Sequence, residues 1–344
     1  MASMSSNSSL DIYMLTEEHM KVVGCIDLAM SLLSLLGAGS ILVYAGIKKK
    51  ICIPEVYPIF HLSLADCLAS LCLLLGATMY LTHEHTMVMS ACHYIVGAAV
   101  CFYIITFLLT MTYAVEVYNK MKRELSAREN STGRKARKKC NVLHPLYIMS
   151  WAVPLLVAFA FMLVTRREED DWYSILPPAT GCEACLPLFH YNDDLCMSQK
   201  TDVEGWEKAM KYLFLGPLTL TMLVNFVIYV LIIRAFRQIQ MTRGVLSYQQ
   251  HKVERQVKVK AMRYQLVFFF CWIPSLVLGV FSISSKFDMN QYFWLYVLQG
   301  LTAPLQGFFN SLVYGWNRDG FKRAITEPFL KHAAPSTSYS SVSL

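Results

Sequence analysis

The chain has 344 residues, of which 55% are hydrophobic and only 16% are charged, and its formal net charge at pH 7 is +7. Soluble globular domains carry about 25% charged residues, so this composition argues against a soluble protein and for a membrane protein. A positive balance in so apolar a chain is expected to attract anionic lipid headgroups, not nucleic acid.

Seven apolar stretches are each long enough to cross a bilayer, which takes roughly 20 residues of helix. Backbone polar groups cannot stay unpaired in lipid, so stretches of this kind are expected to be helical. The sequence therefore predicts an all-α membrane protein built as a seven-transmembrane helix bundle. In chain order, the predicted helices are Val22–Ile47, Tyr57–Leu81, Ser90–Tyr118, Val142–Val164, Ala209–Phe236, Met262–Ser284 and Tyr292–Trp316.

The basic residues predict how the bundle is oriented. The first, third and fifth connections and the C-terminal segment together hold 24 of the 31 lysines and arginines. Positive residues gather on the cytosolic side of membrane proteins, so the N-terminus is expected outside and the C-terminus in the cytosol. Asn7 begins an Asn-x-Ser sequon on the predicted outer side and is expected to be glycosylated. We expect the plasma membrane as the location, with internal membranes as the open alternative.

Segments flanking the bundle have a different composition. Residues 1–21 are expected to form an extracellular arm, 22–316 the transmembrane domain and 333–344 a disordered Ser-rich tail. Residues 317–332 bring an apolar side chain every four positions with basic residues between them. That pattern predicts a short amphipathic eighth helix on the inner leaflet.

Four of the eleven cysteines fall on the predicted outer side, where disulfides form. Cys92 opens the third helix, and the other three lie in the long connection before the fifth helix. We expect a bridge from Cys92 to Cys182 or Cys196, with Cys185 also open as the partner.

Ionisable side chains inside a span are costly, so each is a candidate functional group. Asp66 lies in the middle of the second helix and must find a proton, a cation or a hydrogen-bond network within the bundle. Asp27 lies near a helix end and is expected to reach the outer interface. Pro274 is expected to bend the sixth helix just above Trp272. Other polar side chains are expected to join helices to one another: Thr106, Asn225, Gln299, Gln306, Asn310 and Ser311.

Five short motifs, each in its own predicted helix, resemble the landmarks of seven-helix G-protein-coupled receptors. In the third helix, Glu116 lies 24 residues after Cys92, a spacing that at about 1.5 Å per residue crosses the membrane. The motifs are Leu62–Asp66, Ser150–Pro154, Phe268–Pro274, Asn310–Tyr314 and the tripeptide Glu116-Val117-Tyr118.

The last third of the chain is similar to a narrower group, the orphan membrane proteins called transmembrane protein 116. The likeness runs through Ala261–Phe321 and includes Phe269–Trp272, Tyr296–Gln299 and Tyr314–Trp316. This resemblance implies a receptor-like fold and supplies no ligand.

The resemblance to receptors implies three groups of site residues. A polar network, which in receptors can hold sodium, corresponds to Asp66, Thr106, Trp272 and Asn310. The switch motifs correspond to Glu116, Val117, Tyr118, Trp272, Pro274 and Tyr314. A ligand pocket corresponds to Ala99, Tyr103 and Trp294.

The chain also departs from the receptor pattern. Val117 stands where receptors carry arginine, so Glu116 is expected to pair with another base, such as Lys120 or Lys258. The first helix has Gly37–Ser40 where receptors place asparagine, and these small residues are expected to serve close packing. Pro304 lies near the position of the opsin lysine, which argues against retinal. The third helix has no carboxylate in its outer half to hold an amine.

These observations favour an orphan membrane receptor that signals by movement of its sixth helix, with a heterotrimeric G protein as the implied partner. The alternative is a seven-helix scaffold or trafficking protein that has lost coupling. A transporter or channel is least expected, because no inverted repeat is visible. An enzyme, a metal site and a cofactor are not expected, because no intramembrane cluster has the required spacing.

Overall fold

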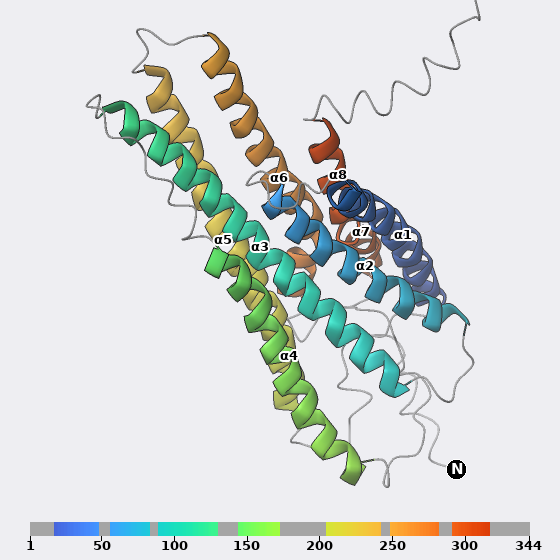
Figure 1. Cartoon of the computed structure of the whole chain (residues 1–344). Helices are drawn as coiled ribbons and strands as arrows, with labels where there is room; N and C mark the ends of the chain where they lie inside the picture. Colours follow the sequence, from blue (N-terminus) through green and yellow to red (C-terminus); the bar gives the residue numbers. More distant parts are fainter. Residues whose placement is uncertain are drawn as a thin grey trace, which may run out of the picture.

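The computed structural model describes residues 17–47, 56–82, 89–129, 144–172, 204–241, 248–281 and 291–316 (Figure 1). The regular secondary structure of these residues is all helical, which confirms the all-α prediction. The helices are α1 (Glu17–Ile47), α2 (Tyr57–Thr82), α3 (Met89–Glu129), α4 (His144–Trp172), α5 (Glu204–Met241), α6 (Tyr248–Phe281), α7 (Phe293–Thr302) and α8 (Gln306–Trp316).

Five helices contain segments long and apolar enough to cross a membrane. A sixth helix, α4, contributes the shorter apolar segment Pro145–Ala160. Large apolar side chains on the outside of the bundle, such as Leu36 and Leu156, are about two-thirds exposed, as expected of surfaces that face lipid. The chain is therefore a multi-pass membrane protein. The five segments are Glu18–Ile47, Tyr57–Thr82, Tyr94–Lys122, Tyr212–Ala235 and Met262–Phe281.

The predicted helix Tyr292–Trp316 is not continuous, which corrects the prediction. It is divided into α7 and α8 by a break at residues 303–305. Pro304 has no N–H, so the carbonyl of Gly300 loses its helical donor. The Gln306 N–H donates to the carbonyl of Ala303 at 3.4 Å instead of to the residue four positions back. The amphipathic helix predicted for 317–332 is a different segment and lies outside the described residues, as does the tail 333–344.

Several helices continue beyond the apolar limits predicted from the sequence. Helix α3 runs on to Glu129, α4 to Trp172 and α5 to Met241, while α1 begins at Glu17 within the predicted arm. The added residues include Glu, Lys, Arg and Gln, which are good helix formers in water. Hydropathy therefore predicts only the part of each helix that contacts lipid. The polar residues beyond that part stay helical because of their high helix propensity.

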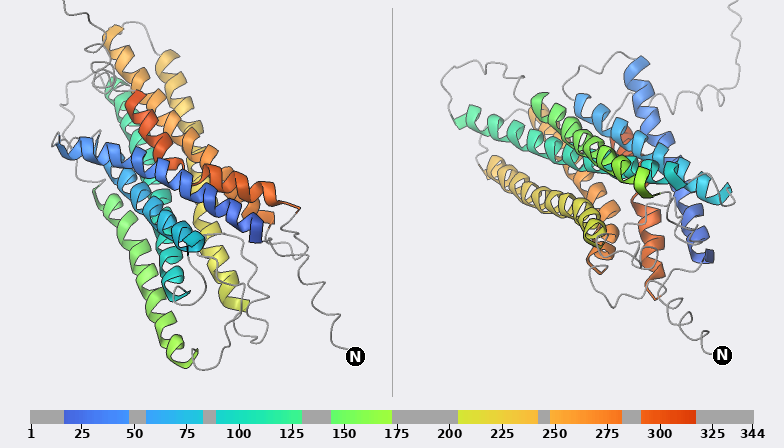
Figure 2. Two further views of the ribbon diagram at one scale, coloured as in Figure 1. Left: turned by 90° about the vertical axis from the view of Figure 1, so that its right-hand side faces the viewer. Right: turned by 90° about the horizontal axis from the view of Figure 1, so that it is seen from below.

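Helix α3 is the central element of the bundle. It packs against α2, α4, α5 and α6, whereas α1 packs against α2, α7 and α8 on the other side. Figure 1 shows α1 beside α7 and α8, and both views of Figure 2 show α4 at the edge of the bundle, against α3. This arrangement brings α2, α3, α6 and α8 together around one interior region.

Candidate functional site

Asp66 is the centre of a buried hydrogen-bond network. Its side chain in α2 is only 4% exposed. One carboxylate oxygen, Oδ2, accepts a hydrogen bond of 2.8 Å from Nδ2 of Asn310, and Oδ1 accepts bonds of 3.3 Å from Thr106 Oγ1 and from Gln306 Nε2. The carboxylate therefore joins α2 to α3 and α8. The three hydrogen bonds offset the desolvation cost of burying this group in the bundle interior.

Gln306 extends the network to α6. Its Oε1 accepts a hydrogen bond from the indole Nε1 of Trp272, while its amide nitrogen donates to Asp66. Gln306 is the first residue of α8, so it stands at the end of the break that follows α7. The four residues predicted to form a polar network are thus brought together. The sequence had marked Gln306 only as one of several interhelical polar residues, and its position as the bridge to Trp272 was missed.

Close approach of α1 and α8 positions this network. A Cβ placed on Gly307 would lie 2.6 Å from Ser34 Oγ and 3.1 Å from Asp66 Cβ. A Cβ on Gly37 would lie 2.7 Å from the Cα of Phe308. Glycine is required at both positions because any side chain would overlap its neighbours. For Gly37, the predicted role in close packing agrees with the structure.

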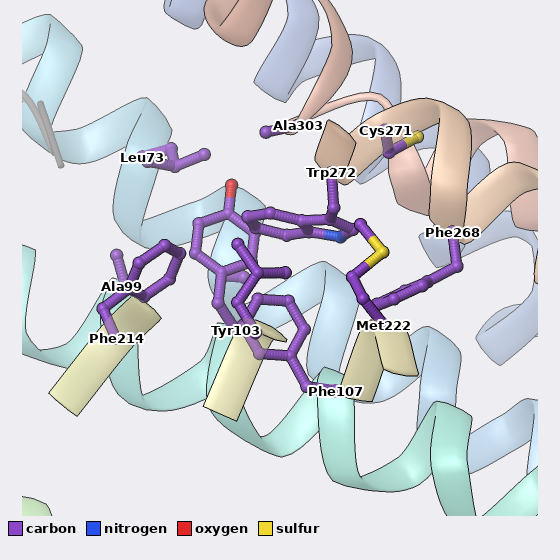
Figure 3. Packing of buried hydrophobic residues seen from close by; sticks show 12 residues of the cluster. Leu73, Ala99, Tyr103, Phe107, Phe214, Met222, Phe268, Cys271, Trp272 and Ala303 are labelled. Carbon is purple, nitrogen blue, oxygen red and sulfur yellow. The ribbon is translucent and has the colours of Figure 1, made fainter. Parts of the chain in front are cut away.

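Aromatic rings pack around the indole of Trp272. The ring centroids of Tyr103 and Phe107 lie 4.7 and 4.6 Å from it, both edge-on. Figure 3 shows these rings packed with side chains from α2, α3, α5 and α6, Ala99 among them. Trp294, the third predicted pocket residue, is 57% exposed and is not brought to Ala99 and Tyr103. Helix α7 buries the neighbouring Leu295 and Tyr296 and turns Trp294 outward.

Among the described side chains, Glu116 has a phenol as its partner and not Lys120, and the side chain of Lys258, the other predicted base, lies outside the description. The hydroxyl of Tyr147 in α4 donates a hydrogen bond of 2.7 Å to Glu116 Oε2. The Tyr147 ring in turn lies 5.2 Å from that of Tyr57, edge-on, and 5.7 Å from that of His61. Opposite charge, the signal that predicts a partner for a carboxylate, does not point to Tyr147, because its phenol carries no charge.

The other predicted switch residues lie in separate apolar environments. Val117 is 5% exposed and packs with Ile228 and Ile232 of α5, and Tyr118 lies half-buried beside this cluster. Tyr314 of α8 is buried in a different cluster, with residues of α1, α2, α3 and α6. Pro274 is buried within α6, two residues beyond Trp272. The network reaches Trp272, whereas Val117 lies in the apolar cluster with α5.

Asp27 is buried, contrary to the expectation that it reaches the outer interface. Its side chain is 6% exposed, and its Oδ1 lies 3.0 Å from the position that a Cβ on Gly300 would take. Because Gly300 has no side chain, α7 comes close enough to α1 to cover the carboxyl.

Cys92 is buried at the beginning of α3. Five other cysteines are free thiols, of which Cys101 and Cys271 are buried and Cys25 is exposed. Cys182, Cys185 and Cys196 lie outside the described residues, and so does Asn7, so the bridge and the glycosylation stay predictions. The five free thiols are Cys25, Cys67, Cys72, Cys101 and Cys271.

Comparison with known proteins gives a family and a distant relative. The family model described as Transmembrane protein 116 matches residues 20–335. Cyclic AMP receptor-like protein C of Dictyostelium discoideum is 23% identical over 171 residues, which cover 49% of this chain and 38% of that protein. The chain thus spans well under half of the length of that relative. With nearly all of its helical region covered by the family model, the chain belongs to the transmembrane protein 116 family.

Proposed function

We propose that this protein is a seven-helix membrane receptor in which the Asp66 network couples α6 to the rest of the bundle. The observation that carries the proposal is the hydrogen-bond chain from Trp272 through Gln306 to Asp66. A displacement of α6 must break or rearrange this chain. Pro274 stands two residues beyond Trp272 and removes a helical hydrogen bond where a bend would act on it.

The proposed bundle has its N-terminus outside and its C-terminus in the cytosol. Five membrane-length segments and the apolar part of α4 supply six crossings. Helices α7 and α8 together supply the seventh, since a broken helix is tolerated where neighbouring helices re-pair its backbone. The distribution of basic residues supports the orientation. A tag near Ser9 should be reachable on intact cells and a C-terminal tag only after permeabilisation. The reverse pattern would contradict the orientation.

The distant relative supports a receptor and leaves the ligand open. That relative is described by its name as receptor-like, and the likeness covers about half of this chain. Amines held by a third-helix carboxylate and retinal remain unexpected, for the reasons drawn from the sequence. The proposed intracellular partner is a heterotrimeric G protein, which would meet the basic connections, and the proposed site of action is the plasma membrane.

The burial of Val117 favours the alternative, a scaffold or trafficking protein that has lost coupling. This side chain lies among Ile228 and Ile232 and leaves no polar group at the position where receptors carry arginine. An arginine placed there would put a guanidinium into an apolar cluster, at a cost of several kcal/mol unless the group reaches water.

A G-protein activation panel in cells tests the proposal. Sensors for each G-protein family would be read with the parent chain, with Trp272→Phe and with Trp151→Phe. The first substitution removes the N–H that binds Gln306. The second removes an indole N–H that has no hydrogen-bond partner among the described residues, so it is the matched control. A receptor should show a signal that Trp272→Phe changes and Trp151→Phe does not.

Val117→Arg completes the panel. A signal only in the arginine variant would indicate a receptor fold decoupled at this position, and a signal in both proteins would indicate an active atypical receptor. Silence in parent and variant at equal surface yield would contradict coupling and favour the scaffold.

A further inference from the structure

One face of α1 changes character halfway along the helix. Asp27, Ser31 and Ser34 are spaced four and three residues apart, so they share one face, and they are 6%, 0% and 0% exposed. The same face continues through the buried apolar residues Ala38, Ile41 and Ala45. We call Asp27, Ser31 and Ser34 the α1 polar seam. It begins one turn after Val23, which is buried on the same face among apolar side chains, and it stops where the apolar half begins.

The seam ends beside the Asp66 network. Ser34 Oγ lies 2.6 Å, and Asp66 Cβ 3.1 Å, from the point that a Cβ on Gly307 would occupy. The Ser34 hydroxyl is therefore a close neighbour of the Asp66 side chain. At the other end, the Asp27 carboxyl lies against Gly300. The seam thus follows α7 and the break, from the covered carboxyl of Asp27 to the central carboxyl of Asp66.

Polar atoms along the seam have unused hydrogen-bonding capacity. Within the described part of the chain, Ser31 Oγ, Ser34 Oγ and Gln299 Oε1 are fully buried and make no hydrogen bond. The carbonyl of Gly300 has lost its helical donor, because Pro304 has no N–H. Buried polar groups in this state are the usual partners of internal water, which needs two to four of them. A serine hydroxyl both donates and accepts, so it passes a proton on without holding a charge.

No cationic side chain faces the two carboxyls among the described residues. The titratable groups that interact electrostatically with Asp66 are the phenols of Tyr103 and Tyr264 and the thiols of Cys67 and Cys271, and Tyr103 interacts with Asp27 as well. A carboxylate in an apolar bundle without a base binds a proton or a metal ion. Gly300 lies close to the Asp27 carboxyl and Gly307 lies close to Asp66 Cβ, and a hydrated metal ion would have to fit beside these closely packed backbones. A proton needs no such space.

We propose that Asp27 is a proton-accepting site and that the α1 polar seam carries protons between water at the N-terminal end of α1 and the Asp66 carboxyl. Water protonates the Asp27 carboxylate. Each hydroxyl or bound water then gives up one proton as it receives another, so that Asp66 gains a proton and Asp27 regains its charge. Ala38, Ile41 and Ala45 keep the other half of this face dry. The seam is independent of G-protein coupling, and in the proposed orientation its Asp27 end is the one nearer the outside.

Infrared spectroscopy of the full chain in lipid nanodiscs tests this route. Both faces meet the same solvent in a nanodisc, so the result does not depend on the proposed orientation or function. The carboxyl bands of Asp27 and Asp66 are assigned by their loss in Asp27→Asn and Asp66→Asn, over about pH 5 to about pH 8. After a change from H2O to D2O, the Asp66 band of the parent should shift quickly. Asp27→Asn and the double variant Ser31→Ala/Ser34→Ala should slow that shift several-fold.

Ser40→Ala is the matched control. Ser40 lies on the same helix, is exposed, and donates its hydroxyl to the carbonyl of Gly37 at 2.6 Å, so its loss should leave the exchange rate of Asp66 unchanged. If Asp27→Asn does not fold, the double serine variant carries the test. Equal exchange in parent and seam variants would overturn the proposal, as would the absence of a protonated carboxyl band at every pH. Loss of the Asp66 band on adding sodium at constant pH would also overturn it, in favour of a metal ion.

Discussion

The side-chain amide of Asn310 donates a hydrogen bond of 2.8 Å to Oδ2 of Asp66, and this short bond holds α8 against α2. It is the shortest of the three side-chain bonds that the carboxylate accepts among the described residues. Both residues are at least nine-tenths buried, so water cannot replace either partner without opening the bundle. These hydrogen bonds give Asp66 a structural role, and a signalling role would require that they rearrange.

Replacing Asp66 by leucine should therefore destabilise the protein strongly. Leucine would leave the donors on Thr106, Gln306 and Asn310 without an acceptor, at about 1–3 kcal/mol for each buried group. Asp66→Asn keeps one acceptor oxygen and should cost less. The measurement is thermal unfolding of each variant in detergent.

Sodium adds a second comparison for Asp66. If the carboxylate holds sodium, added sodium should stabilise the parent by RT ln(1 + [L]/Kd) and leave Asp66→Asn unchanged. A harmless Asp66→Leu, with parent and variants equally indifferent to sodium, would remove Asp66 from the functional residues.

The bond between Tyr147 and Glu116 should be measurable as a coupling between α3 and α4. Tyr147→Phe removes the hydroxyl that donates at 2.7 Å and keeps the ring contacts with Tyr57 and His61. We expect a loss of about 1–3 kcal/mol in the free energy of unfolding, since the acceptor is a carboxylate. A double-mutant cycle with Glu116→Gln isolates the pair. Additive effects in that cycle would show that the hydrogen bond contributes nothing.

Gly307→Ala should disturb the joint between α1, α2 and α8. Its new methyl group would lie 2.6 Å from Ser34 Oγ and 3.1 Å from Asp66 Cβ, so the Ser34 hydroxyl must move and the helices must give way by a few tenths of an ångström. Overpacking of this kind costs about 1–3 kcal/mol. Gly46→Ala is the control: nothing lies within 4 Å of its Cβ position, and alanine favours helix there by up to about 1 kcal/mol.

Relief of that contact gives a further check on Gly307. Adding Ser34→Ala to Gly307→Ala removes the nearest atom and should restore part of the lost thermal stability. A double variant as unstable as the sum of its parts would place the strain elsewhere.

Cys92→Ser should reduce folding or surface yield. A structural disulfide at the start of α3 would contribute about 2–5 kcal/mol, which the serine variant loses. Cys25→Ser is the control, since Cys25 is an exposed free thiol. Yield would be read by surface labelling, together with a count of titratable thiols before and after reduction. Unchanged yield and an unchanged thiol count would contradict the bridge.

Asp66 was predictable from the sequence because a carboxylate in mid-span has few physical options. Thr106, Asn310 and Trp272 followed from their resemblance to receptor motifs. Gln306 could not be singled out, because an amide in a helix can bind any of several neighbours. The neighbours that the Gln306 amide binds depend on how α8 is rotated about its axis after the break, and hydropathy does not predict this rotation.

The break itself shows why proline is a weak guide to helix ends. Pro154, Pro217 and Pro274 lie inside the continuous helices α4, α5 and α6, whereas Pro304 lies at a break. Each removes one hydrogen bond, so the difference must come from tertiary packing. At Pro304, the side chain of the next helical residue, Gln306, is fixed by both Trp272 and Asp66.

Asp27 was placed wrongly for a related reason. The exposure of Asp27 depends on the helix face on which the residue lies and not on its distance from the helix end. Its spacing to Ser31 and Ser34 was present in the sequence and predicts a shared buried face. Trp294 is the converse case, an aromatic residue that the sequence could not assign to either face of a ten-residue helix.

The division between α7 and α8 also decides what kind of motion can pass through this part of the molecule. An unbroken helix moves as a rigid body, so a displacement of one end also displaces the other end, along or across the helix axis. Two short helices joined at residues 303–305 can rotate relative to each other, so α7 can turn while α8 keeps the hydrogen bond from Asn310 to Asp66. Gln306 is the first residue after this hinge. A rotation of α7 would therefore reorient the side-chain amide of Gln306, which bonds both Trp272 and Asp66.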